Sequence, residues 1–128
     1  MRRAFLDSQV AIWAATGDAR LTTPVRRAIN GHSVTVISAI TIAELEMKAA
    51  IGKFSLPRNL VGLYEAEGIV VEAFDALASE QLSRFPQLNR HDPFDRMILA
   101  HAASRLGTTF FTADEALIDL GLDWVAAV

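Results

Sequence analysis

The sequence predicts an α/β fold in which a central, mainly parallel sheet of four to five strands is flanked by helices. Short apolar runs rich in β-branched and aromatic residues, such as residues 34–38 (VTVIS) and 108–112 (TTFFT), alternate with longer segments of helical spacing. Adjacent positions in these runs are apolar, as in Val36-Ile37 and Phe110-Phe111, rather than only every second position, which is typical of strands covered by helices on both faces.

Length and composition indicate one domain over residues 1–128, because 128 residues, 52% of them hydrophobic, can bury a core without covalent staples. The absence of cysteine excludes disulfides and thiolate metal sites. No apolar run approaches the ~20 residues of a membrane span, and the amino-terminal apolar stretch is too short for a signal peptide. We therefore expect a cytoplasmic protein that does not enter a membrane.

The elements follow in order from local signals. Residues 4–7 (AFLD) predict a short buried strand, and the helical pattern after them stops near Gly17. In the next helix Thr23 is the expected N-cap and Pro24 the first helical residue. Beyond the strand at 34–38, helices are expected at residues 41–52, 57–67, 75–85, 92–107 and 114–121, and strands at 69–74, 108–112 and 122–128.

The charge balance argues against a protein that coats nucleic acid. The formal net charge is −3 and the isoelectric point is about 5.5, whereas such proteins are strongly basic. A nuclease is still compatible with this composition, because cations bound in an acidic pocket reverse the local field and allow it to hold a phosphate backbone.

Four acidic residues lie where predicted strands hand over to helices. Asp7 and Asp114 follow apolar strands, and Glu44 and Asp95 lie early in helices. Ligand sites in parallel sheets lie beyond the carboxyl ends of the strands, so we expect these side chains to converge. Each carboxylate pair at ~4 Å would cost roughly 4 kcal/mol at an effective dielectric near ~20. A divalent cation relieves this repulsion, and oxygen-only ligands favour Mg²⁺ or Mn²⁺.

Each acid also has a local explanation. Asp7 and Asp114 can cap the helices that follow them. Glu44 lies three residues after Thr41, which is the spacing of a capping box.

The same applies to the segment HDPFDR. Asp92 precedes Pro93, and we interpret it as an N-cap with proline at the first helical position. Asp95 would then lie near the third helical position, where the helix dipole favours a negative charge. Caps explain each acid singly, but they do not explain why four acids fall at the same edge of the predicted sheet.

Four segments, in this order and at these separations, resemble a PIN-domain ribonuclease of the VapC toxin type. They are FLDSQVAIWAATGDARL, SAITIAELEMKAAIGKF, HDPFDRMILAHA and FFTADEAL. The resemblance implies an endoribonuclease that hydrolyses RNA with Mg²⁺ or Mn²⁺, a homodimer, and a cognate antitoxin bound by the apolar arm at residues 43–54 and 56–64. By motif, the catalytic and metal-binding residues implied are Asp7, Glu44, Asp95 and Asp114. Gln9 departs from the family pattern, which usually has Asn, His or a small polar residue there.

Roles follow for the neighbouring residues. We expect Ser8 and Thr112 to donate hydrogen bonds to the acids. Arg96, directly after Asp95, is interpreted either as a contact to an RNA phosphate or as a surface salt bridge. His101 is expected to be a packed or surface residue rather than a ligand.

Two other functions are compatible with parts of the pattern. One is a catalytically inactive PIN fold that only binds RNA or a protein partner. The other is a receiver-like phospho-acceptor domain, which needs an acceptor Asp after its third strand and a Lys after its fifth. Residues 69–74 and 122–128 offer neither cleanly, so the ribonuclease is the favoured prediction.

Overall fold

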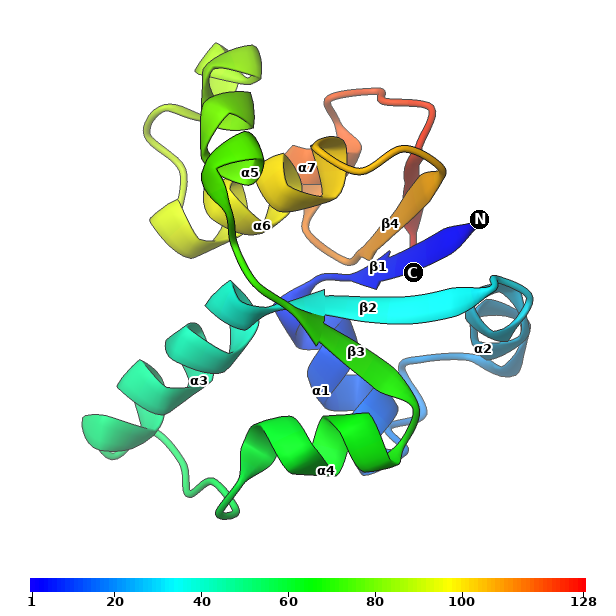
Figure 1. Ribbon diagram of the computed structural model, residues 1–128, viewed down its shortest axis with the longest axis vertical. Coiled ribbons are helices and arrows are strands. Elements are labelled where there is room, and N and C mark those ends of the chain that lie inside the picture. Colours follow the sequence, from blue (N-terminus) through cyan, green and yellow to red (C-terminus); the bar gives the residue numbers. More distant parts are fainter.

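The computed structural model describes residues 1–128 and contains one five-stranded sheet with the order β3-β2-β1-β4-β5. All neighbouring strands run parallel. The strands are β1 (Arg3–Leu6), β2 (Val34–Ser38), β3 (Ile69–Glu72), β4 (Thr108–Thr112) and β5 (Val125–Ala127). The predicted α/β class and parallel sheet are confirmed. Because the strands are parallel, their carboxyl ends meet at one edge of the sheet (Figure 1).

Helices cover the two faces of this sheet, as Figure 1 shows. The α-helices are α1 (Ser8–Thr16), α2 (Thr23–Asn30), α3 (Ala39–Ala50), α4 (Leu60–Ala66), α5 (Ala76–Glu80), α6 (Pro93–Ala103) and α7 (Glu115–Ile118), and two 3₁₀ turns, η1 (Gln81–Arg84) and η2 (Pro86–Leu88), follow α5. None of them has the length and apolar character needed to cross a membrane.

Two hydrophobic clusters form the core, one on each side of the sheet. In β1, Ala4 and Leu6 belong to the cluster that includes α1 and α4, while Phe5 between them belongs to the cluster with α6 and α7. Adjacent strand residues point to opposite faces, and both faces are buried. That is the physical reason for the uninterrupted apolar runs in the sequence.

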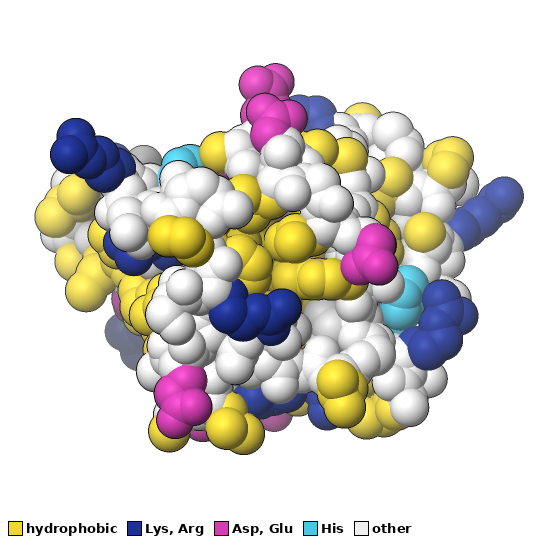
Figure 2. All heavy atoms as spheres, turned by 90° about the horizontal axis from the view of Figure 1, so that it is seen from above, with side chains coloured by type: hydrophobic (Ala, Val, Ile, Leu, Met, Phe, Trp, Pro, Cys, Tyr) yellow, Lys and Arg dark blue, Asp and Glu magenta, His cyan; other side chains and the backbone are white.

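The end of the molecule seen from above carries a mixed surface. Figure 2 shows apolar side chains in the middle of this face, with Lys, Arg, Asp and Glu side chains spread around them rather than joined in a stripe of one sign. This agrees with the net charge of −3.

Several helix starts differ from the sequence prediction. Thr22, not Thr23, is the N-cap of α2, because the backbone of Thr22 is still extended (φ −67°, ψ 160°) and Thr23 is already helical. The helix α4 begins at Leu60 rather than near residue 57. Asn59 before it has a left-handed backbone (φ 57°), and its side chain accepts a hydrogen bond from Gly62. Residues 75–85 are helical only as the short α5 followed by a 3₁₀ turn.

Gly107, between α6 and β4, packs closely against the backbone of Met1. Its φ is +73°, and a Cβ there would lie 2.6 Å from the carbonyl oxygen of Met1. Gly121 has a similar φ of +69° but no atom within 4 Å of the same position. We predict that Gly121→Ala lowers the free energy of unfolding by about 1 kcal/mol, the usual cost of a left-handed backbone. Gly107→Ala should cost clearly more, because it adds a clash with backbone. Urea unfolding of both variants measures the difference, and equal losses would contradict the close packing at Gly107.

Candidate functional site

The four acids singled out in the sequence line one cavity of about 400 Å³ at the carboxyl edge of the sheet. Asp7 directly follows β1, Asp114 lies two residues after β4, Glu44 is in α3 after β2, and Asp95 is in the first turn of α6. The predicted convergence is therefore present. Other residues that line the cavity are Ser8, Gln9, Ile12, Leu45, Lys48, Phe54, Asp92 and Ala113.

Asp7 is the most enclosed of the acids, with only 4% of its surface exposed. Its Oδ1 accepts a hydrogen bond from the Ser8 amide at 2.9 Å, and its Oδ2 accepts one from the Thr112 hydroxyl at 2.6 Å. Burial raises the pKa of Asp7 to about 6; the two hydrogen bonds oppose this rise, and the nearby carboxylates of Asp114 and Glu44 add to it. The expected Thr112 contact is thus present across the pairing of β1 and β4.

Glu44 is almost as buried, with 5% of its surface exposed, and is fixed by two partners. Its Oε1 accepts a hydrogen bond from the Ser8 hydroxyl at 2.7 Å, and its Oε2 lies 2.8 Å from the Lys48 ammonium, whose pKa is raised by this contact. The capping-box interpretation is wrong, because Ser38 is the N-cap of α3 and Thr41 lies inside the helix. The Thr41 hydroxyl instead lies 3.0 Å from the Ser8 hydroxyl.

Asp95 and Asp114 face His91, a residue to which the sequence pattern assigned no role. The His91 Nε2 lies 3.0 Å from Asp114 Oδ2 and 3.4 Å from Asp95 Oδ2. Burial alone would lower the pKa of His91, but the hydrogen bond to Asp114 and the surrounding carboxylates raise it overall. The signal that would have found His91 is its four-residue spacing to Asp95 within HDPFD.

The pKa of Asp95 is the most displaced of the four acids, at about 7. Burial is the largest cause, followed by the negative charges of Asp7 and Asp92 and then of the other acids. Burial and the mutual repulsion of the carboxylates therefore favour the protonated forms of Asp7 and Asp95.

Capping and membership of the site are not alternatives in this structure. Asp92 caps α6, as predicted, by accepting hydrogen bonds from the amides of Phe94 at 2.8 Å and Asp95 at 3.3 Å. Asp114 uses its Oδ1 to accept from the amide of Ala116 at 2.9 Å at the start of α7. Its Oδ2 is left for the cavity and His91. One carboxylate thus fixes a helix end and is held in place by it.

Arg96 does not form the surface salt bridge that the sequence suggested as one interpretation. Its guanidinium donates a hydrogen bond to the Asn89 carbonyl at 3.3 Å, and the residue is not part of the cavity lining. Its proposed contact to an RNA phosphate stays a prediction.

A second cavity, of about 830 Å³, adjoins the acidic one and is mostly apolar. The two cavities share Ile12, Leu45 and Phe54 in their linings. The larger cavity is bounded by α1, α2, α4 and the segment between α3 and α4, and its apolar lining includes Leu21, Ile29, Leu56, Leu60, Leu63 and Ile69. We refer to it as the apolar groove.

The chain is an α/β protein with a parallel sheet, and its acidic cavity lies beyond the carboxyl ends of the strands, where such folds bind their ligands. The family follows from the sequence itself: residues 4–121 match the model of the PIN domain, and the chain belongs to that family. The receiver-like alternative is therefore wrong. The strand order also excludes a receiver domain, because receiver domains have the order 2-1-3-4-5 and this sheet has the order 3-2-1-4-5.

Solved structures support the same fold. A chain of VapBC2 from Rickettsia felis, bound to a DNA fragment from its promoter, matches with a TM-score of 0.67 and 14% identity over 98% of this chain and 97% of that one. DNA-bound VapBC from Salmonella typhimurium matches with a TM-score of 0.63 and 22% identity, over 100% of this chain and 98% of that one. A toxin-antitoxin complex from Klebsiella pneumoniae gives 0.63 and 17%, over 96% and 95%. No curated protein matches the chain significantly in sequence.

The raised pKa values predict how the stability of the metal-free protein depends on pH. Asp7 and Asp95 move from 3.8 to about 6 and about 7 on folding, so between pH ~4 and ~7 the folded state binds protons that the unfolded state has released. The contribution of these two carboxyls to the free energy of unfolding should therefore fall as the pH rises through this window, while the lowered pKa of the buried His101 acts in the opposite direction. The raised pKa of His91 acts in the same direction as the two carboxyls, because its stabilising charge is lost as the pH rises.

Urea unfolding in a chelating buffer measures this slope. Asp95→Asn should flatten it, because it removes both a raised group and a charge that acts on Asp7. Asp123→Asn, at an exposed position outside the cavity, should leave it unchanged. Equal slopes in the wild-type protein and in Asp95→Asn would contradict the assignment of raised pKa values to Asp7 and Asp95.

Proposed function

We propose that this protein is a metal-dependent endoribonuclease and the toxin component of a toxin–antitoxin pair. The observation that carries the proposal is the gathering of Asp7, Glu44, Asp95 and Asp114 around one cavity. Membership of the PIN domain family and the likeness of the fold to toxin–antitoxin complexes support it.

The residues present suit a hard divalent cation such as Mg²⁺ or Mn²⁺. Carboxylates dominate the cavity, and one ligand atom each from His91, Asp95 and Asp114 lies within 4.8 Å of the others. In the proposed site Asp7 and Asp95 contact the ion directly, Asp114 acts through water, and Glu44 binds the ion or orients the attacking water. When bound, such an ion activates water and neutralises charge on the phosphoryl oxygens.

The remaining side chains hold these acids in place. Thr112 and the Ser8 amide fix the two oxygens of Asp7, so that the carboxylate cannot rotate away from the cavity. Ser8 and Lys48 do the same for Glu44. Removing hydrogen bonds of this kind to metal-binding carboxylates typically lowers metal affinity or activity by roughly 10–100-fold.

An inactive PIN fold that only binds RNA or a partner is the second candidate. The intact set of four acids, each held by specific partners or at a helix start, favours the enzyme. The two candidates differ in one measurable property, which is metal-dependent cleavage of RNA.

The apolar groove suits an antitoxin. Its lining is mostly hydrophobic, and Leu63 within it is 48% exposed. The first part of the apolar arm, residues 43–54, also exposes Met47 and Ile51, whose exposed fractions are 60% and 72%. Apolar grooves and patches that are open to solvent often mark protein interfaces. We propose that the groove binds the antitoxin and that the exposed arm contributes to a homodimer.

Cleavage should depend on the metal and on the acids. We predict that the purified chain degrades total RNA with Mn²⁺ and that EDTA abolishes this. Asp7→Asn and Asp95→Asn should each lower the cleavage rate on the order of 100-fold or more, because each removes charge that holds the ion. Asp123→Asn, at an exposed position outside the cavity, is the matched control and should keep full activity. RNA binding without metal-dependent cleavage would favour the inactive fold.

Antitoxin binding should depend on the groove. We predict that Leu63→Glu prevents co-purification with the proposed antitoxin, because burying a charge in an apolar contact is costly. Leu77→Glu is the matched control, since Leu77 is 60% exposed on α5 and does not line the groove. Equal loss in both variants would argue against the groove as the binding surface.

A further inference from the structure

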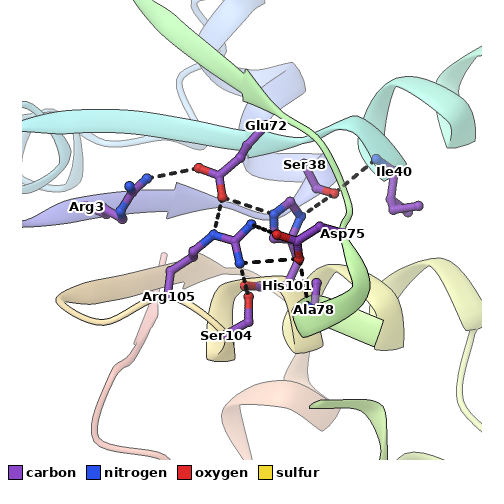
Figure 3. A network of polar contacts seen from close by, with 9 residues as sticks. All are labelled: Arg3, Ser38, Ile40, Glu72, Asp75, Ala78, His101, Ser104 and Arg105. Atoms are coloured by element: carbon purple, nitrogen blue, oxygen red, sulfur yellow. Dashed lines mark hydrogen bonds and ion pairs between the residues drawn. The ribbon is translucent and has the colours of Figure 1, made fainter. Parts of the chain in front are cut away.

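His101 lies at the centre of a polar network that the proposed chemistry does not use (Figure 3). The side chain is fully buried in the last turn of α6. Its Nδ1 lies 2.8 Å from the Ser38 hydroxyl and its Nε2 lies 3.3 Å from Glu72 Oε1. A buried imidazole with two partners has a fixed orientation.

The hydrogen-bond partners define the protonation of this ring. The Ser38 hydroxyl oxygen already accepts a hydrogen bond from the Ile40 amide at 3.0 Å, so its hydrogen is free to be donated to His101 Nδ1. The ring then donates Nε2–H to the Glu72 carboxylate. Burial lowers the pKa of His101 below its usual value, in agreement with a neutral ring.

The network joins elements that carry the acids of the site. Ser38 is the N-cap of α3, which carries Glu44, and His101 lies on α6, which carries Asp95. The ring also packs edge-on against Phe5 of β1, with centroids 5.0 Å apart, two residues before Asp7.

The contact between His101 and Ser38 lies close enough to the acids, along both helices, to affect their positions. Glu44 lies six positions beyond Ser38 in α3, and His101 lies six positions beyond Asp95 in α6. Both intervals correspond to about 9 Å of helix. A helix is stiff over this length, so a shift of α3 at Ser38 is carried to the Glu44 carboxylate.

We propose that His101 is a positioning residue that fixes the start of α3 against α6 and so sets Glu44 relative to Asp95 in the metal site. The inference rests on the proposed function and extends it to a residue remote from the acidic cavity. Arg105 forms ion pairs with Glu72 and Asp75, so the carboxylate oxygen that accepts the hydrogen bond from His101 is itself held in place.

Two substitutions separate the effect of the His101 hydrogen bonds from the effect of its side-chain volume. His101→Leu keeps an apolar side chain of similar size but leaves Ser38 without its acceptor. His101→Gln supplies one acceptor and one donor and should rescue the contacts. Arg3→Gln is the matched control, because it removes an ion pair from the other oxygen of Glu72 and leaves the His101–Ser38 contact intact.

Two measurements are made on the folded, full-length variants. Calorimetric titration with Mn²⁺ should show affinity on the order of 10-fold weaker in His101→Leu and near the wild-type value in His101→Gln and Arg3→Gln. Hydrogen exchange of the Ile40 amide should become faster in His101→Leu but not in His101→Gln or Arg3→Gln. Ser38→Ala should reproduce both effects, and the double variant should add little, as expected for residues that act together.

Wild-type affinity and wild-type exchange in His101→Leu would overturn the inference. The same holds if Arg3→Gln loses as much affinity as His101→Leu, because the effect would then follow general stability. If the wild-type chain binds no Mn²⁺, the proposed function fails, and Ile40 exchange alone decides the inference: unchanged exchange in His101→Leu overturns it, and selective acceleration supports it.

Discussion

The mutual repulsion of carboxylates gathered at one edge of a parallel sheet is the constraint on which the rest of the site depends. The protein manages it with neighbouring side chains. Hydroxyls and amides hold Asp7, the Lys48 ammonium pairs with Glu44, and His91 lies between Asp95 and Asp114. Burial and the neighbouring charges also raise the pKa values of Asp7 and Asp95, which favours their uncharged forms. The repulsion is thereby reduced in a cluster of side chains of the kind that can hold a metal ion.

Helix starts solve a second problem, which is how to aim flexible acids. Asp7, Asp92 and Asp114 all accept hydrogen bonds from amides at the beginnings of helices. A carboxylate held in this way has lost most of its rotational freedom before any ligand arrives. The two oxygens of Asp114 have different partners: Oδ1 caps α7, and Oδ2 faces His91. The local explanation of these acids as caps and their place in the cavity are therefore both correct.

The parallel sheet and the convergence of the four acids were predictable from the sequence, because apolar runs that alternate with helices fix the fold class, and parallel strands bring their carboxyl ends together. Contacts between distant segments were not. The Ser8 hydroxyl meets Thr41 and Glu44, more than thirty positions away, and this contact overrides the capping-box pattern. His91 was not predicted because its partner Asp114 lies 23 positions further along the chain, at the start of α7. Local sequence also could not reveal that Arg96 turns back to Asn89.

The pairing of β1 with β4 has a consequence for the life of the chain on the ribosome. Thr112 contacts Asp7 across a separation of 105 positions, and Asp114 comes later still. A nascent polypeptide that has exposed only its first hundred residues lacks both the strand and the final acid. Translation adds roughly 5–20 residues per second, so several seconds pass between the synthesis of Asp7 and that of Thr112 and Asp114. The cavity can therefore form only after these late residues have left the ribosome.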